Sequence, residues 1–246
     1  MKRKTKIMLS ILGFLIAGLF TAVFILQALT YPAFNEGRAI LLLDHTEDIG
    51  SAIIVHPAEV AKATIIFYPG GLVEPESYLF LANGLSMKDY RVIIPRMPLN
   101  LAILGQTRAN DYLEYVEGPL LLAGHSLGGA SAAFYANRFP EYLEGLILMA
   151  AYPASSLDLS DRTLPVLSIY ATRDTVLDFD AFYETQMLLP PTTVYVPIEG
   201  GNHAGFASYG PQSGDGEALI SRFDQQQLTI EAIERWFYET FEEDPS

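Results

Sequence analysis

The stretch "PLLLAGHSLGGASAAF", residues 119–134, decides how the rest of the chain is interpreted. A short apolar run, typical of a buried strand, leads into Gly124-x-Ser126-x-Gly128, and a segment rich in helix-forming residues follows. The glycines permit a tight turn between strand and helix, which lifts the serine hydroxyl above the edge of a sheet. The alternative is a glycine-rich turn whose serine only caps the helix. We predict that Ser126 is a nucleophile.

Apolar runs rich in β-branched residues recur along the chain and alternate with helix-like segments. Strands are predicted at 38–43, 51–56, 63–68, 90–95, 119–124, 145–150, 165–171 and 192–198. Helices are expected at 76–87, 106–115, 127–138 and 180–189, and an amphipathic one is marked by Ile230, Ile233, Phe237 and Phe241. Strands without polar alternation are typical of a sheet covered on both faces. The pattern predicts a doubly wound, mostly parallel α/β sheet with helices on both faces, whose ligands bind at the carboxyl ends of the strands.

A nucleophilic serine needs a base within hydrogen-bond reach, and that base needs an orienting acid. The loop after the last predicted strand carries His203, and the segment "TRDTV" after the preceding strand carries Asp174. The order Ser126, Asp174, His203 predicts a catalytic triad in which His203 transfers the proton and Asp174 orients the His203 imidazole. Asp174 also fits a helix cap, and Asp178 is the alternative acid.

The other three histidines are weaker candidates for the base. His45 lies before the core sheet, and His56 ends a strand before a proline. His125 adjoins the nucleophile, but on so tight a turn its side chain is expected to point elsewhere. We expect His203 itself on a flexible, polar loop outside the core.

Acyl chemistry also needs hydrogen-bond donors for the oxyanion. The first is expected to be the backbone N–H of Leu127, the residue after the nucleophile. The second is expected from "YPGGLVEPESY", residues 68–78, where paired glycines permit close backbone approach. Either Gly71 or Leu72 would donate, and a plain Gly-Gly turn is the alternative.

The N-terminal segment is distinct from the rest of the chain. Ile7–Leu29 contains no charge in 23 residues, and four of the first six residues are basic. As a helix it would span about 35 Å, enough for a bilayer core of roughly 30 Å. We predict a single-pass cell-membrane anchor at 1–30 and a catalytic domain at 31–246 on the non-cytoplasmic side. A cleaved signal peptide and a buried core helix are the alternatives.

Composition excludes several classes of site. The 246 residues include no cysteine, so disulfides and thiolate chemistry are excluded. The formal net charge is −14, and such an acidic protein repels phosphate backbones, so no nucleic-acid partner is expected. The spacing of His, Asp and Glu suggests no catalytic metal, and no cofactor is expected.

Taken together, residues 38–243 resemble the α/β-hydrolase superfamily, in particular its small, uncapped, dienelactone-hydrolase-like branch. The resemblance rests on "GHSLGG", "YATRD" and "EGGNHAGF", with "YPGG" where many relatives have His-Gly. It implies a hydrolase acting on an ester or related acyl bond through an acyl-enzyme. Dienelactone hydrolases proper use a cysteine nucleophile, so dienelactones are not the expected substrate. The 14 residues 151–164 are too few for a cap domain between the sixth and seventh strands.

The substrate is expected to be a small acyl compound, and four residues are candidates to contact it. Arg96, just past a strand end, would bind a carboxylate, although a structural salt bridge is an equal alternative. Tyr152, Phe206 and Tyr209 would line an acyl pocket, although a self-bonded loop is favoured for the segment around Tyr209. Without a cap, short acyl groups are expected. An acyltransferase, a peptidase and a catalytically silent binding domain remain alternatives.

Overall fold

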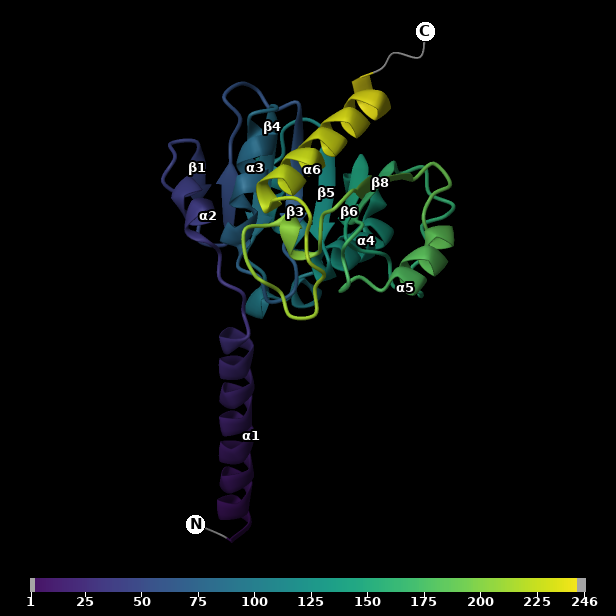
Figure 1. The fold of residues 1–246 in the computed structure, drawn as a ribbon. Coiled ribbons are helices and arrows are strands. Elements are labelled where there is room, and N and C mark those ends of the chain that lie inside the picture. The colour runs from purple at the N-terminus through teal and green to yellow at the C-terminus, as the bar shows by residue number, and fades with distance from the viewer. Residues whose placement is uncertain (1–2, 243–246) are drawn as a thin grey trace.

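The computed structural model describes residues 3–242 and shows a long helix, α1 (Arg3–Ala28), projecting from a body in which helices cover a central sheet (Figure 1). The sheet has eight strands in the order β1-β2-β4-β3-β5-β6-β7-β8. The strands are β1 (Thr46–Asp48), β2 (Ala52–Val55), β3 (Ala63–Tyr68), β4 (Tyr90–Pro95), β5 (Leu120–His125), β6 (Gly145–Met149), β7 (Val166–Ala171) and β8 (Val194–Ile198). Strands β3 to β8 are parallel, while β2 runs antiparallel to both β1 and β4. The predicted α/β sheet is confirmed.

Helices cover both faces of this sheet. The other helices are α2 (Asn35–Ile40), α3 (Leu79–Ser86), α4 (Leu127–Arg138), α5 (Phe179–Glu184) and α6 (Arg222–Phe237). Alternate residues of β3 enter two separate cores: Ile65 packs with α3 and α6, whereas Ile66 packs with α4. Each such buried isoleucine contributes about 1.5–3 kcal/mol to folding. The two-sided core explains why the parallel strands are apolar without alternation.

The prediction of a first strand at 38–43 is wrong. These residues contribute to α2 and the turn after it, and the first strand is Thr46–Asp48. Gly37 and Ile40, three residues apart, are buried on one side of the helix, and Leu42 is exposed. A side chain at Gly37 would place its Cβ 2.6 Å from the carbonyl oxygen of Glu76, so the close packing of α2 depends on this glycine.

The connection between β6 and β7 carries no cap domain. Residues 150–165 form no helix or strand, only turns and irregular backbone. The expectation of an uncapped fold is confirmed, and the carboxyl edge of β5 to β7 stays open above the sheet. The predicted helix at 106–115 is a 3-10 helix over Arg108–Tyr115.

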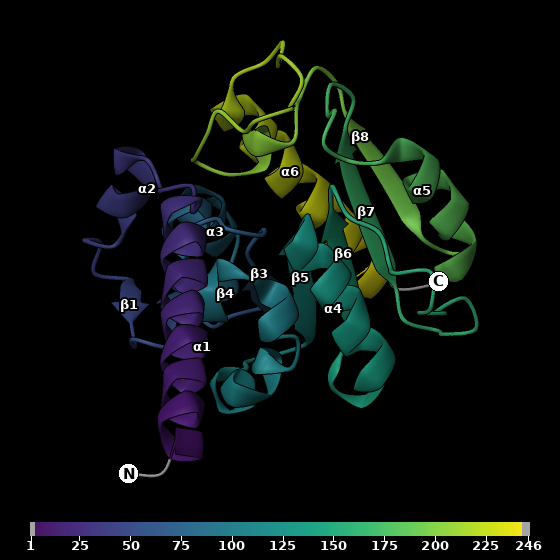
Figure 2. The same ribbon diagram turned by 90° about the horizontal axis from the view of Figure 1, so that it is seen from below.

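Helix α1 is long and apolar enough to cross a membrane. The segment Ile11–Ala28 has a mean hydropathy of 2.3 and is not buried against the body. A membrane anchor and a signal sequence both have this form. Figure 2 looks along the vertical axis of Figure 1 from below, toward the face of the body from which α1 departs.

Candidate active site

Ser126 occupies a strained turn between β5 and α4. Its backbone angles are φ 53° and ψ −122°, a conformation that residues other than glycine rarely adopt. Added Cβ atoms would lie 2.4 Å from the carbonyl carbon of Gly128 if placed at Gly124, and 2.1 Å from the carbonyl oxygen of Tyr68 if placed at Gly128. Ser126 precedes α4, but its side chain makes no capping hydrogen bond. The helix-cap alternative therefore does not describe this serine.

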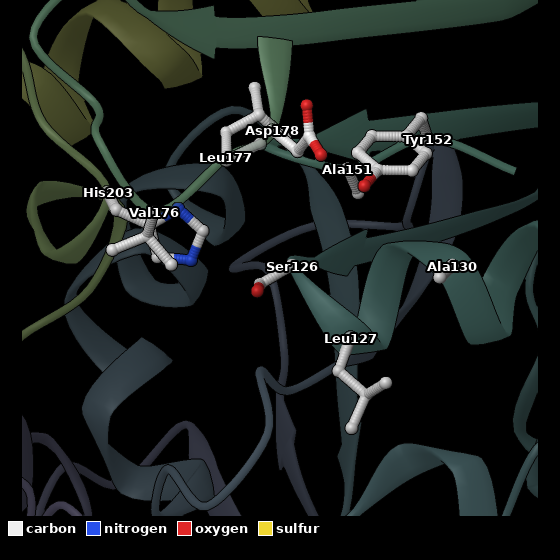
Figure 3. A pocket seen from close by; sticks show the side chains of 10 residues that line it. Ser126, Leu127, Ala130, Ala151, Tyr152, Val176, Leu177, Asp178 and His203 are labelled. Carbon is white, nitrogen blue, oxygen red and sulfur yellow. The ribbon is translucent and has the colours of Figure 1, made fainter. Parts of the chain in front are cut away.

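The predicted acid and base are hydrogen-bonded to each other. Nδ1 of His203 lies 2.7 Å from Oδ2 of Asp174, and the two residues are only 2% and 4% exposed. The other carboxylate oxygen, Oδ1, accepts the backbone N–H groups of Val176 and Leu177 at 2.8 Å each. Because Nδ1 is engaged, Nε2 is the nitrogen left for the cavity that His203 shares with Ser126. Figure 3 shows the Ser126 hydroxyl pointing toward the His203 ring.

The alternative acid, Asp178, has a structural role of its own. Its Oδ1 accepts the backbone N–H of Ala181 at 3.1 Å and so caps the N-terminus of α5. Asp178 also lines the cavity, but no hydrogen bond joins it to His203 within residues 3–242. The geometry favours Asp174 as the partner of His203.

The expectation that His203 lies on a flexible loop outside the core is wrong, because other residues fix its backbone. Asp215 accepts the N–H groups of His203 at 3.1 Å and of Ala204 at 2.8 Å. Gln225, buried on α6, accepts from the N–H of Asn202 at 3.0 Å and donates to its carbonyl at 2.8 Å. Sequence reasoning missed Gln225, since its partner lies 23 residues away and no local pattern marks the pair.

The structure separates the two candidates for the second oxyanion donor. The N–H of Leu72 donates to the carbonyl of Asn100 at 2.7 Å and is therefore engaged. The N–H of Gly71 has no acceptor in the part of the chain that the structure describes, and neither does that of Leu127. A Cβ on Gly71 would lie 3.0 Å from Cδ2 of Leu127, so these two residues are in close contact. Gly71, not Leu72, has the free donor beside Leu127.

A buried tyrosine links this glycine loop to the turn at the nucleophile. The hydroxyl of Tyr78 accepts the N–H of Gly70 at 2.9 Å and is also hydrogen-bonded to Nδ1 of His125 at 2.9 Å. Burial lowers the pKa of His125 well below its usual value, and the nearby His203 lowers it further. A neutral His125 is able to accept the Tyr78 proton at Nδ1. Tyr78 gave no signal in the sequence, because its link to His125 spans 47 residues and no local pattern marks it.

A cavity of about 290 Å³ opens over Ser126 (Figure 3). It is lined by Ser126, Leu127, Ala130, Ala150, Ala151, Tyr152, Val176, Leu177, Asp178 and His203. Of the four predicted substrate contacts, only Tyr152 lines it. Phe206 is buried with its ring centroid 5.5 Å from that of His125, and the buried Tyr209 donates to Gln212 at 2.6 Å.

Arg96 does not reach this cavity, so its prediction as a substrate contact is not supported. Its guanidinium donates to Glu76 and to Asp48, both at 2.7 Å. The salt-bridge alternative describes this arginine. Across residues 3–242, no group of three or more His, Asp or Glu side chains is arranged to hold a metal ion.

Comparison with known proteins identifies the family. The family model described as "Alpha/beta hydrolase family" matches residues 64–227, which is 164 of the 246 residues. The chain belongs to the alpha/beta hydrolase family. A comparison with curated proteins found no match.

Solved structures similar to this α/β-hydrolase share its fold at low sequence identity. Est1E from Butyrivibrio proteoclasticus with bound ferulic acid has a TM-score of 0.59 at 14% identity, covering 78% of this chain and 95% of that chain. Dienelactone hydrolase from Anabaena variabilis has a TM-score of 0.58 at 15% identity, covering 79% and 95%. A putative lipase from Acinetobacter baumannii has a TM-score of 0.58 at 16% identity, covering 83% and 94%.

Proposed function

We propose that this α/β-hydrolase is a serine hydrolase that cleaves a carboxylic ester or a related acyl bond. The observation that carries the proposal is the buried 2.7 Å hydrogen bond between Asp174 and His203, on a histidine that shares a cavity with the strained Ser126. A serine hydroxyl becomes nucleophilic when such an oriented base removes its proton.

The reaction would proceed in two steps. Ser126 Oγ attacks the carbonyl carbon while Nε2 of His203 takes the hydroxyl proton, and Asp174 stabilises the resulting imidazolium. The negative charge on the carbonyl oxygen is met by the N–H groups of Leu127 and Gly71. His203 then protonates the departing alcohol, leaving an acyl group on Ser126. Water, deprotonated by the same histidine, releases the acid and restores the serine.

A panel of esters, thioesters and amides tests this proposal directly. We expect the full chain to hydrolyse esters, because the open cavity admits an acyl group beside Ser126 and His203. A protein that turns over none of the three would contradict the proposal. Turnover of amides alone, or acyl transfer to an added alcohol without hydrolysis, would replace it by a peptidase or an acyltransferase with the same residues.

Tyr78→Phe tests whether the buried tyrosine positions the oxyanion donor. The change removes the hydroxyl that holds Gly70 and His125, so the adjacent Gly71 N–H loses its fixed direction. We expect kcat to fall roughly tenfold to a hundredfold with KM within about threefold, because the donor acts mainly in the transition state. Phe80→Leu, a change in the neighbouring helix outside this network, is the control. Equal losses of kcat and thermal stability in both variants would indicate a packing role only.

We further propose that α1 is an uncleaved membrane anchor with the catalytic body on the non-cytoplasmic side. The uncharged length of the helix and the basic residues before it support this orientation. Protease added to intact cells, or to spheroplasts where an outer membrane exists, is expected to release the body. A mature N-terminus near Tyr31 would show a cleaved signal instead, and full protection from protease would reverse the orientation.

A further inference from the structure

Helix α1 joins the body at the rim of the candidate site. After Ala28 the chain keeps helical hydrogen bonds through Leu29, and Tyr31 is then fixed by a bridge to the segment after the glycine loop. The Tyr31 N–H donates to the Leu72 carbonyl at 2.7 Å. Three residues reach at most about 10 Å. If α1 crosses a membrane, Tyr31, which is hydrogen-bonded to Leu72 beside the glycine loop, therefore lies within about 10 Å of the end of the membrane-spanning helix.

The same face carries an uncharged loop beside the end of α1. Residues 97–107, "MPLNLAILGQT", contain no charged side chain. Asn100 in this loop donates from its side chain to Thr30 Oγ1 at 3.5 Å, and its carbonyl accepts from Leu72. Ile103 and Leu104 are 54% and 55% exposed. Figure 1 shows α1 leaving the body on the side where the loop between β8 and α6 also lies.

An apolar groove leads from this loop to the nucleophile. A second cavity, of about 210 Å³, is lined by Ile103 of this loop together with Phe134 and Leu157. It shares Leu127 and Ala130 with the cavity over Ser126, so the two adjoin along α4. The groove thus connects exposed apolar side chains near α1 with the hydroxyl that the proposed function makes nucleophilic.

We propose that the loop 97–107 contacts the bilayer surface and that the substrate is an ester lodged in the membrane, whose acyl chain enters along this groove. The inference rests on the proposed hydrolase function and on retention of α1. An acyl chain that leaves the bilayer beside Ile103 stays in contact with apolar walls until its carbonyl reaches Ser126. The sequence-based expectation of short acyl groups considered only the loops around the nucleophile. The groove extends the apolar surface available to a longer acyl chain, and each methylene group that packs against it strengthens binding.

The location of the loop is tested without any catalysis. Because the chain has no cysteine, Ile103→Cys provides a single attachment point for a nitrobenzoxadiazole dye in the full-length protein. In phosphatidylcholine vesicles we expect blue-shifted emission that nitroxide-bearing lipids quench. Val60→Cys is the control, because Val60 is 84% exposed and precedes β3 at the amino end of the parallel strands, whereas the loop 97–107 follows the carboxyl end of β4. Equal, water-like emission at both positions would overturn the proposal.

The substrate class is tested by a ratio of rates in the same vesicles. We expect the wild-type chain to favour p-nitrophenyl laurate, which partitions into the bilayer, over water-soluble p-nitrophenyl acetate. Ile103→Asn with Leu104→Asn is expected to lower the laurate-to-acetate ratio roughly tenfold. The control pair is Val60→Asn with Met87→Asn, both exposed at the amino end of the parallel strands, and it should leave the ratio within about twofold.

The outcomes separate the two proposals. An unchanged ratio in the Ile103 and Leu104 variant, or a wild-type preference for acetate, would overturn the membrane-substrate inference while leaving the hydrolase intact. Loss of all ester hydrolysis in the wild-type chain would instead contradict the proposed function, and the dye measurement would still decide where the loop lies.

Discussion

Ser126→Ala is expected to lower kcat for ester hydrolysis on the order of 10⁴-fold or more, because it removes the atom that forms the acyl-enzyme. The fold should persist, since the Ser126 side chain makes no hydrogen bond that caps α4. Ester hydrolysis rates and thermal unfolding of the purified variant measure the two effects. Ser155→Ala, an exposed serine on the connection between β6 and β7, is the matched control and should behave as wild type.

His203→Ala should cost about as much as Ser126→Ala, and the double variant should cost little more than either change alone. Residues that act as one unit lose their function together, so their effects do not add. Two losses that multiply in the double variant would mean that Ser126 and His203 act independently. A Ser126→Ala variant with near wild-type kcat would place the nucleophile elsewhere.

The second large effect separates the two candidate acids. Asp174→Asn is expected to lower kcat on the order of 10³-fold or more, somewhat less than the loss of the serine. The amide oxygen of the asparagine can still accept the N–H groups of Val176 and Leu177. Its amide nitrogen, however, then replaces the oxygen Oδ2 that faces Nδ1 of His203, and an NH₂ group donates to Nδ1 instead of accepting its proton. The histidine is then held in the wrong tautomer.

Asp178→Asn is the internal control for this comparison. Asparagine caps helices about as well as aspartate does, so α5 should keep its N-terminus and kcat should remain within a few-fold of wild type. Steady-state kinetics on one soluble ester is sufficient for both variants. A dead Asp178→Asn beside an active Asp174→Asn would reverse the assignment.

The parts of the fold that could be predicted are those in which local sequence and tertiary environment agree. The strand before Ser126 is buried on both sides, and its apolar run is unbroken. The turn after it has room only for glycine at positions 124 and 128, so the Gly-x-Ser-x-Gly pattern directly predicts the tight turn. The prediction for 38–43 failed because "RAILLL" suits a strand locally, whereas in the fold the chain forms α2 here and buries Gly37 and Ile40 on one side of the helix.

The parts of the site that could not be predicted depend on distant partners. Arg96 follows the carboxyl end of a strand, where substrate contacts are expected. Its guanidinium forms ion pairs with Glu76 and Asp48, which come from two other segments. Tyr78 and His125 are 47 residues apart, and only the folded chain brings them together. Whether Gly71 or Leu72 has the free oxyanion donor likewise depends on Asn100, whose carbonyl accepts the Leu72 N–H.

The central claim is that Ser126 is the nucleophile that His203 activates. Reaction of the full-length chain with a fluorophosphonate, followed by mass spectrometry of its peptides, tests this most directly. We predict a single phosphonyl adduct on Ser126 that forms with wild-type protein and is strongly slowed in His203→Ala. An adduct on another serine, or no adduct on a folded chain, would contradict the claim.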